Sequence, residues 1–504
     1  MKTVAQWNIA DSASLKFAYE HNKWDDNRSL AGSTDNTIGE PIPVQFGVGI
    51  TFHDRRRVAL DQPARFGAES DGYFLTGNFD LGWADLVSYT MYREEETYTY
   101  MDLDGSAAIE PNLPWWAVVF DTENDSFSQE FNLSGNYNDR LDWIIGFFYY
   151  EFNDTFNSLS SQIPAFGFVN ATDVYDEINS EITAWATFVD LTYEINQKWS
   201  VAFGIRYGEE KGEGTLKVAA GNLLTIFPPP IAPGTYKEDD TWESTTPRAV
   251  LRYQINDSSN LYLSYSEGYK AGLLPVSDTR VRLGTIKPES IKAWEIGYKY
   301  SGEMLRMSAA AFSYDYTDLQ VSSYIGTASL TTNAATSTIW GVEFQADAVL
   351  NDNWSVNFGI GYTDSEYDKY LTAPHWSVDL GNAQFVPLAG DASGNQMQRT
   401  PEVTANLGVQ YETSLAQGTL RAGGNYYYTS KIYFDPANQF EQDAYGLLNA
   451  TLSWSTADEK WTFSLFGTNL TDEEYVAQVL SGPPAILETW GQPRSYGASI
   501  GYEF

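Results

Sequence analysis

Apolar and polar residues alternate along most of this chain, and a period of two is that of a β-strand rather than of a helix. In KWSVAFGIRYG (198–208), every second residue from Trp199 to Tyr207 is apolar or aromatic, and those between are small, polar or charged. The same alternation recurs in NWSVNFGIGYT (353–363), EVTANLGVQYE (402–412) and the final RSYGASIGYEF (494–504). RLDWIIGFFYYEF (140–152) is apolar on both faces and fits less well. We count about nineteen such segments, which predicts an all-β chain.

The predicted strands are joined alternately by short and by long connections. Short polar turns are predicted near Asn138–Asp139, Asn196–Gln197, Asn256–Ser259, Gly302–Glu303, Asn351–Asp352 and Ala457–Glu459. Long connections are predicted at roughly 25–70, 94–124, 154–176, 213–238, 273–285, 368–396 and 472–489. Short turns at one end and long loops at the other are typical of a large antiparallel transmembrane β-barrel, with turns in the periplasm and loops outside the cell.

A barrel explains the alternation because a membrane offers no water to unpaired backbone groups, so its strands must pair with one another. Lipid on the outside then favours apolar residues on one face of each strand, and water or a plug on the inside favours polar residues on the other face. The chain has 34 Tyr, 27 Phe and 16 Trp, and Trp199, Trp354, Trp454 and Trp461 fall at predicted strand ends, where barrels carry aromatic girdles. The alternative is a large soluble β-protein, but we find no repeat of about 40–50 residues such as propeller blades leave.

Composition narrows the functional classes. The formal net charge of −37 argues against nucleic acid as a partner, since phosphate binding needs a basic surface. The chain has no Cys and only three His, so neither a disulfide framework nor a thiolate or imidazole-rich metal centre is expected. No run approaches the roughly 18 apolar residues of a membrane helix. No G-x-S-x-G, H-E-x-x-H or phosphate-loop motif occurs, so we predict neither an enzyme nor a resident cofactor.

The direction of the end strands predicts that the barrel is incomplete. With the long loops outside, the first segment (TVAQWNIA) and the last strand both run toward the periplasm. An all-antiparallel bacterial barrel needs an even number of strands to close, so about nineteen leaves something missing upstream. The first residues also lack the apolar core of a signal peptide, which an exported barrel needs.

Several segments resemble, in order, those of the TonB-dependent outer-membrane receptors. They are FSQEFNLSG (127–135), TPRAVLRYQINDSSNLYLSYSEGYKAG (246–272), IKPESIKAWEIGYKYSG (286–302), GVEFQADAVLNDNWSVNFGIGYTDSEY (341–367), RTPEVTANLGVQY (399–411), FGTNLTDEEY (466–475) and the terminal RSYGASIGYEF. Each motif alone is degenerate, but their common order over residues 127–504 is specific.

The resemblance implies that residues 1–504 are the barrel domain of such a receptor, with about three of the family's twenty-two strands absent. It also implies a plug domain that couples to the TonB complex, and no plug precedes the barrel here. We therefore expect either a fragment of a full receptor or a partner chain that supplies the plug. Tyr502 and Phe504 resemble the terminal signal that the barrel-assembly machinery recognises.

The function implied is uptake of a ferric siderophore or similar scarce nutrient across the outer membrane of a Gram-negative bacterium. Uptake of cobalamin, haem or an oligosaccharide remains an alternative, as does a passive porin-like channel. A barrel enzyme acting on lipid is a further alternative, although the three scattered His residues suggest no catalytic pairing.

Ligand contacts are expected from the loops and the upper lumen. The candidate residues are His53, Arg55, Arg56, Arg57, Trp115, Trp116, His375 and Trp376. The tryptophans offer stacking surfaces for a catechol, sugar or porphyrin ring, and the arginine cluster would attract an anionic ferric chelate. The alternative for each is packing within a loop, or charge balance with nearby carboxylates. Likewise DLDG (102–105) and TDEE (471–474) offer oxygen ligands for Ca²⁺, but solvated loop or turn carboxylates are the preferred interpretation, and we predict no metal site.

Overall fold

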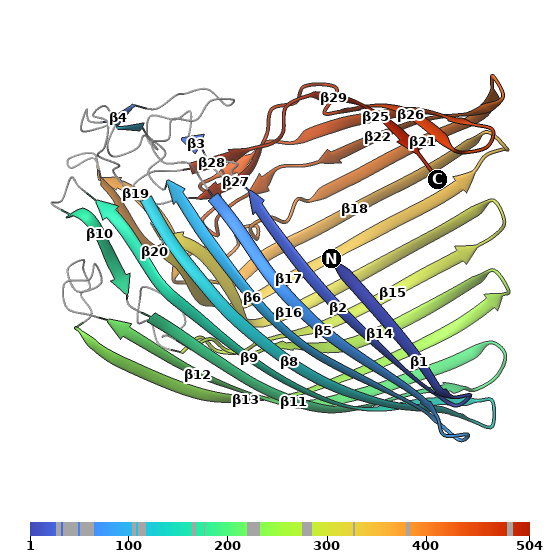
Figure 1. Ribbon diagram of the computed structural model, residues 1–504, viewed down its shortest axis with the longest axis horizontal. Coiled ribbons are helices and arrows are strands. Elements are labelled where there is room, and N and C mark those ends of the chain that lie inside the picture. Colours follow the sequence, from blue (N-terminus) through green and yellow to red (C-terminus); the bar gives the residue numbers. More distant parts are fainter. Residues whose placement is uncertain are drawn as a thin grey trace.

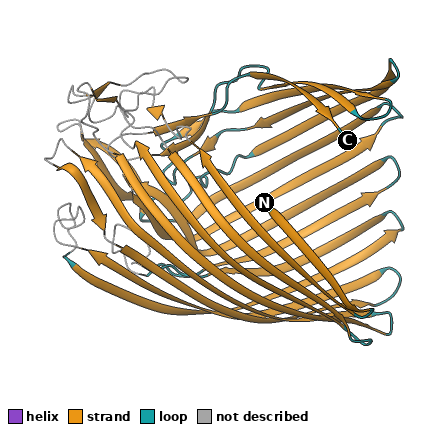
Figure 2. Cartoon of the chain, viewed as in Figure 1, coloured by secondary structure: helices purple, strands orange, loops and turns teal. Residues whose placement is uncertain are grey.

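The protein is one large antiparallel sheet that curls into an incomplete cylinder (Figures 1 and 2). The computed structural model describes residues 1–26, 32–33, 49–50, 65–102, 107–108, 117–163, 168–175, 177–218, 232–274, 285–325, 328–379, 384–480 and 487–503. Its main sheet has 20 strands, and every recorded pairing is antiparallel. One of these strands, β10 (Phe168–Tyr175), only extends the pairing of the upper part of its neighbour β9, so the number of crossing strands agrees with the predicted count. The predicted fold class is confirmed.

The crossing strands follow one another around the sheet in chain order. They are β1 (Lys2–Ala10), β2 (Ala13–Asp26), β5 (Arg65–Asp80), β6 (Asp85–Asp102), β8 (Ala117–Tyr137), β9 (Leu141–Ile163), β11 (Glu177–Glu194), β12 (Trp199–Val218), β13 (Gly234–Asn256), β14 (Ser259–Lys270), β15 (Glu289–Ser301), β16 (Leu305–Ile325), β17 (Ala328–Val349), β18 (Trp354–Lys369), β21 (Val403–Leu415), β22 (Gly418–Thr429), β25 (Tyr445–Thr456), β26 (Trp461–Thr468) and β29 (Ser495–Tyr502).

The remaining strands belong to small sheets among the long connections. They are β19 (Ala373–Asp379) with β20 (Gln384–Gly390), β23 (Ile432–Tyr433) with β24 (Glu441–Gln442), β27 (Val476–Leu480) with β28 (Leu487–Trp490) and β3 (Gly32–Ser33), and β4 (Gly49–Ile50) with β7 (Ala107–Ala108). These sheets gather at one end of the cylinder, called the loop end here, and the short turns gather at the other, the turn end (Figure 1).

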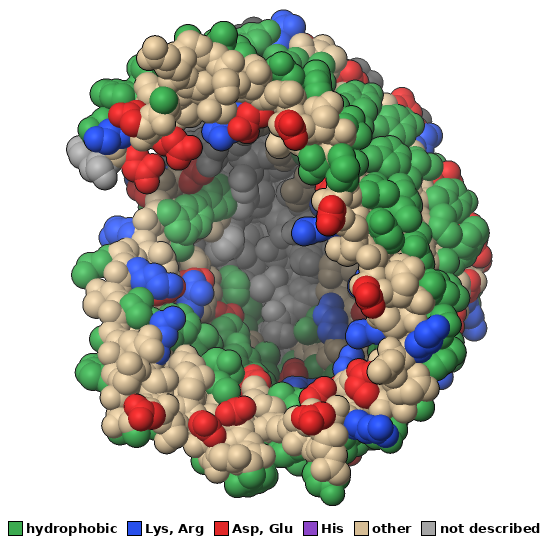
Figure 3. All heavy atoms as spheres, turned by 90° about the vertical axis from the view of Figure 1, so that its right-hand side faces the viewer, with side chains coloured by type: hydrophobic (Ala, Val, Ile, Leu, Met, Phe, Trp, Pro, Cys, Tyr) green, Lys and Arg blue, Asp and Glu red, His purple; other side chains and the backbone are tan. Residues whose placement is uncertain are grey.

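Alternation places the apolar side chains of each strand on the outer wall. Along β12, Phe203 and Ile205 are 50% and 38% exposed. Val201, on the same face, pairs with Leu251 of β13, which in turn pairs with Leu263 of β14. Figure 3, viewed from the turn end, shows apolar side chains spread over the outside and a wide lumen within. Within the described residues no helix is long and apolar enough to cross a membrane.

The cylinder is open along one side. In the described residues, β1 pairs only with β2 and β29 only with β26, so their outer edges have no strand partner. Both edge strands run toward the turn end, and the space between them exposes the opposite wall in Figure 1 and the lumen in Figure 3. We call this opening the seam. Its parallel edges agree with the predicted odd number of strands.

Short hairpin turns form where the sequence predicts them, because Asn and Asp satisfy or tolerate the turn backbone. Asn138 and Asp139 adopt φ values of 56° and 53°, in the left-handed region that both residues accept. At the turn before β12, the Asn196 side chain accepts hydrogen bonds from the N–H groups of Lys198 (2.9 Å) and Trp199 (3.2 Å). Each such turn reverses the chain within a few residues and fixes the register of its hairpin.

The long connections are shorter than predicted, because several strands continue past the apolar part of the wall. Residues 94–102, 117–124, 154–163 and 213–218, predicted as loop, are strand, and the β16–β17 hairpin continues to Ile325 and Ala328. Outside the apolar band both faces of a strand meet water, so polar residues replace the alternation while backbone pairing persists. The prediction that these polar segments are loops was therefore wrong.

A small hydrophobic core stabilises part of the loop end. It comprises the buried side chains of Leu319, Val321, Ala334, Tyr367, Tyr370, Ala373 and Ala392. The Tyr370 hydroxyl shares a 2.5 Å hydrogen bond with Thr332, and burial raises the pKa of this phenol. The connection that follows β18 and the one that follows β22 are joined where the Asn395 amide donates to the Pro436 carbonyl at 3.0 Å. This part of the loop end is thus a packed structure.

Beside it, Asp435 organises the turn between β23 and β24. Its carboxylate accepts hydrogen bonds from the backbone N–H groups of Ala437, Gln439 and Phe440 at 2.8–3.1 Å. Burial raises the pKa of Asp435, while the same N–H donors oppose the shift by favouring the charged form.

Candidate ligand-binding site on the lumen wall

A cavity of about 340 Å³ opens on the lumen wall where β9, β11, β12, β13 and β14 lie side by side. It forms because small residues meet across these strands: Gly208 pairs with Ala186 on one side and with Ser244 on the other. A Cβ atom added to Gly208 would lie 3.3 Å from the Ala186 Cβ, so this floor has no room for larger side chains without adjustment. The surrounding lumen-facing residues are large and form a rim. We call this cavity the lumen pocket.

Aromatic rings form much of the rim. Phe148, Tyr150 and Phe152 occupy alternate positions of β9 and stack in a row, with ring centroids 6.3 and 6.4 Å apart and planes 14° and 7° from parallel. The first two line the pocket, and Trp242 of β13, only 8% exposed, lines it from the far side. These rings explain why residues 140–152 are apolar on both faces: the second face lines the lumen.

Arg206 supplies a positive charge at one end of the pocket. Its guanidinium carbon lies 5.6 Å from the centre of the Phe148 ring and 5.8 Å from that of Phe188, which is cation–π distance. Among the described residues it makes no ion pair. Arg248, two strand residues from the pocket-lining Thr246, differs: it donates two hydrogen bonds to Asp190, at 2.6 and 2.9 Å. Arg206 is therefore held by rings and keeps its hydrogen-bond donors available.

Several oxygen-bearing side chains also line the pocket, and Glu210 and Tyr269 are two of them. Glu210 faces the lumen four residues beyond Arg206 on β12, about 13 Å along the strand. Tyr269, near the end of β14, also lines the pocket, and its buried hydroxyl has no hydrogen-bond partner among the residues that the structure describes. A buried hydroxyl without a partner is costly and uncommon. The pocket thus combines rings, one cation, an unsatisfied hydroxyl and the carboxylates of three glutamates, Glu209, Glu210 and Glu267.

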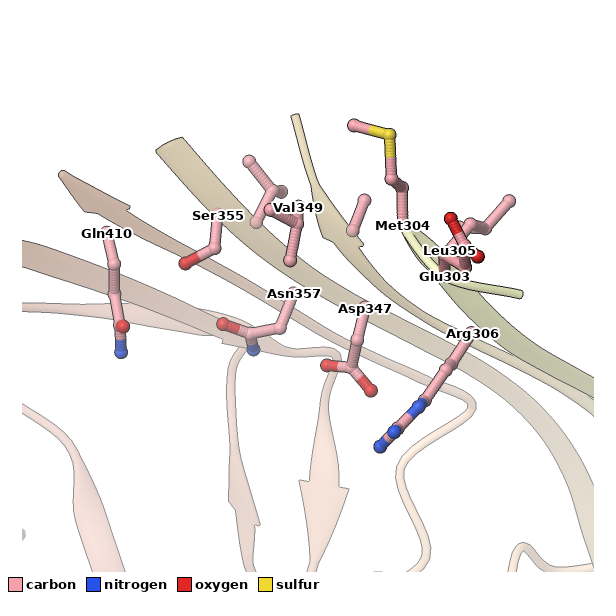
Figure 4. A pocket seen from close by; sticks show the side chains of 11 residues that line it. Glu303, Met304, Leu305, Arg306, Asp347, Val349, Ser355, Asn357 and Gln410 are labelled. Carbon is pink, nitrogen blue, oxygen red and sulfur yellow. The ribbon is translucent and has the colours of Figure 1, made fainter. Parts of the chain in front are cut away.

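A second cavity, of about 400 Å³, lies near the turn end between β16, β17, β18 and β21 (Figure 4). Arg306, Asp347, Asn357 and Gln410 point to one side of the sheet there, and Met304 points to the other. No aromatic side chain lines this cavity. Arg306 makes no ion pair within the described part of the chain, so it resembles Arg206 in charge and availability but lacks the rings.

Most predicted ligand-binding residues lie outside the described residues. This applies to His53, Arg55, Arg56, Arg57, Trp115 and Trp116. His375 is described and half-buried in β19, where its ring lies against Gly390 of β20: a Cβ added to that glycine would meet the ring at 2.7 Å. Trp376 pairs with Pro387 in the same hairpin, and its side chain is outside the described set. His375 does not line either cavity described above.

The predicted terminal signal is described only in part. Tyr502 ends β29 and its ring packs on Trp461 of β26, with centroids 4.7 Å apart, while Phe504 lies outside the described residues. Of the two possible calcium segments, the side chains of DLDG are outside the described set. In TDEE, Asp472 instead pairs with Arg494 at 3.6 Å. Nowhere in the described chain do three or more carboxylate, His or Cys groups gather as metal ligands.

The lumen pocket was not predicted from the sequence. Arg206 and Glu210 were visible as charged residues on the polar face of one strand, and this was the available signal. Their aromatic neighbours come from β9, β11 and β13, so only the register of the sheet brings them together.

Comparison with known proteins gives consistent matches. The chain is 23% identical over 512 residues to the "Probable TonB-dependent siderophore receptor PiuA" of Acinetobacter baumannii, covering 92% of this chain and 64% of that protein. It is 26% identical over 285 residues to the "Ferrichrome outer membrane transporter/phage receptor" of Escherichia coli, covering 54% and 34% of the two chains. The chain spans less than two thirds of the length of these curated relatives.

Among solved structures, the fold is similar to the ferric yersiniabactin uptake receptor FyuA from Yersinia pestis. The TM-score is 0.77 at 16% identity, over 100% of this chain and 70% of that one. The sequence pattern of the family described as "TonB dependent receptor-like, beta-barrel" matches residues 6–470. Since this match covers most of the sequence, the chain belongs to the TonB-dependent receptor-like β-barrel family.

Proposed function

We propose that this chain forms the wall of an outer-membrane receptor that takes up a ferric siderophore with energy from TonB. The observation that carries the proposal is the two-faced sheet: an apolar outer wall suited to lipid encloses a lumen whose wall holds a pocket lined by aromatic rings, one arginine and three glutamates. The relatives support it, since their names describe a siderophore receptor and a ferrichrome transporter. On this proposal the loop end faces the outside of a Gram-negative cell and the turn end faces the periplasm.

We propose further that strands from outside these 504 residues close the seam. An unpaired strand edge is untenable in lipid, because each unsatisfied backbone group costs several kcal/mol there. Since β1 and β29 run in the same direction, only an odd number of added strands pairs antiparallel with both. A plug domain, in the same polypeptide or another, would occupy the lumen and contact TonB. The final strand, with Tyr502 and Phe504, would be recognised by the barrel-assembly machinery.

Iron-dependent growth and transport test the proposal. In the source bacterium, deletion of the gene should abolish uptake of at least one radioactive ferric siderophore under iron limitation, and a plasmid copy should restore it. Uptake should also stop when the membrane potential is collapsed, because TonB transmits that energy. Uptake of every ferric chelate at the parental rate in the deletion strain would refute the proposal.

Conductance separates this function from a passive channel. A receptor whose lumen holds a plug should be nearly silent in a planar bilayer, whereas a porin-like protein should conduct steadily. A steady conductance of the natively purified protein, together with uptake that persists without membrane energy, would establish the channel instead.

A further inference from the structure

The lumen pocket presents a cation that forms no ion pair with any described residue of this chain. Arg206 lies over two phenyl rings and makes no ion pair within the described residues. The formal charge of the whole chain is −37, so carboxylates are plentiful, and neighbouring Arg248 is paired with one. The phenyl rings orient the guanidinium without using its N–H donors, which match a planar, bidentate oxygen acceptor.

The rest of the pocket fits a flat, apolar group attached to that acceptor. Phe148, Tyr150 and Trp242 present ring surfaces around a floor of Gly208, Ala186 and other small residues. Aromatic rings stack on such surfaces at centroid distances of about 4.5–7 Å. A volume of about 340 Å³ is in the range that binds small organic molecules.

The end of the pocket away from Arg206 favours ligands that carry hydrogen-bonding substituents. Within the described part of the chain, the buried Tyr269 hydroxyl has no hydrogen-bond partner and Glu210 makes no hydrogen bond. A ligand hydroxyl can donate to Glu210 or bond with Tyr269, whereas a second anion placed there would be repelled by the carboxylate. The three features together describe an aromatic ring that carries an anionic oxygen group on one side only.

We propose that the lumen pocket binds an aryl anion, a ring bearing a carboxylate or a deprotonated hydroxyl, with the anionic oxygens on Arg206 and the ring against Phe148, Tyr150 and Trp242. This inference rests on the proposed function, since it names the chemical class of the iron chelate that the lumen accepts. Chelators built from catechol or salicyl units present such rings, whereas purely hydroxamate or citrate chelators do not. The site is on the barrel wall and needs no residue of the plug.

Binding of salicylate to the purified protein tests the site. Salicylate combines a ring and one carboxylate; phenol supplies the ring without the charge at neutral pH, and citrate supplies charge without a ring. In equilibrium dialysis against matched detergent buffer, salicylate should bind at least ten-fold more tightly than either control. Equal binding of salicylate and citrate, or of salicylate and phenol, would overturn the proposal.

Paired variants assign binding to the pocket. Arg206→Ala should weaken salicylate binding about ten-fold and Arg206→Lys less, because lysine keeps the charge but not the planar fork. Arg306→Ala removes an equally available arginine that has no ring beside it and should leave binding unchanged. Equal losses in the Arg206→Ala and Arg306→Ala proteins would show general electrostatic attraction and refute the site.

A filling variant provides an independent check. Ser244→Trp places a large ring over the pocket floor and should abolish salicylate binding, whereas Thr245→Trp adds the same ring to the opposite face of β13 and should not. Folding of every variant is verified by its heat-dependent gel mobility. Unchanged binding in a folded Ser244→Trp protein would place the ligand elsewhere.

The outcome remains distinguishable from that of the uptake experiment. If the bacterium takes up only hydroxamate chelates through this protein and salicylate does not bind, the pocket assignment fails while siderophore uptake stands. If salicylate binds through Arg206 but no ferric chelate depends on the gene, the uptake proposal fails while the aryl-anion site stands.

Discussion

Placing an arginine on the outer wall tests whether lipid covers this sheet. Phe203 lies on β12 halfway between Trp199 and Tyr207, about 13 Å along the strand from each, and is 50% exposed. Half of a phenylalanine side chain is about 100 Å², so Phe203→Ala should cost about 2.5 kcal/mol in lost apolar contact. Arginine at the bilayer midplane adds about 2–4 kcal/mol. We therefore expect Phe203→Arg to destabilise the folded protein by about 5 kcal/mol.

The adjacent residue supplies the control, because alternation turns Ala202 toward the lumen. Ala202→Arg should cost less than about 1 kcal/mol, since a solvated arginine on a polar wall loses little hydration. Urea-dependent folding into phosphatidylcholine vesicles, followed by tryptophan fluorescence, gives the free energy of each variant relative to the parent. Equal losses for Phe203→Arg and Ala202→Arg would refute the membrane orientation of the wall, and a larger loss for Ala202→Arg would invert it.

Three other predictions concern the ends of the cylinder. Tyr367→Ala leaves a cavity in the loop-end core and should lower the local free energy of unfolding by about 3–5 kcal/mol. Amide exchange should become faster around this core but not in the barrel strands, and equal acceleration in both would contradict the prediction. The Ser393 hydroxyl and N–H donate to Asp391 and hold the pKa of its carboxyl below the usual value, so the stabilisation by these hydrogen bonds is complete above about pH 4 and is lost as pH falls through the lower folded pKa. Amide exchange at this turn should therefore become faster on acidification, and Ser393→Ala should remove most of that pH dependence. The same pH dependence in the Ser393→Ala protein would contradict the assignment. Tyr502→Ala removes the ring contact with Trp461, which contributes about 0.5–1.5 kcal/mol. The variant should show a lower folded fraction in outer membranes, and a folded fraction equal to that of the wild type would contradict this prediction.

The alternation of residues was sufficient to predict the fold because each membrane-spanning residue meets either lipid or lumen. It assigned Phe203 and Ile500 to the outer face and Arg206 and Ser499 to the inner one, and the registers agree. Turns with Asn were equally visible. The turn at Ala416 and Gln417 was not, because these residues adopt φ values of 50° and 57° without the usual turn chemistry.

Sequence could not predict the lumen pocket for a physical reason. Its rings and Arg206 come from strands that are separated by up to about 100 residues, and a shift of one residue in any register would turn the side chains of that strand to the other wall. The loops offered conspicuous Trp and Arg clusters, which composition alone can reveal. A single sequence contains no comparable pattern to show which residues lie next to each other on neighbouring strands.

The parallel edges of the seam also restrict self-association. All copies that insert into one membrane with the same polarity point their β1 and β29 strands the same way, so any edge of one copy meets any edge of another in parallel. Every pairing recorded within this sheet is antiparallel, and a parallel ladder has a different hydrogen-bond pattern that is slightly less stable per residue. Pairing between the edges of two copies is therefore slightly less favourable than the antiparallel pairing that the proposed closing strands would make.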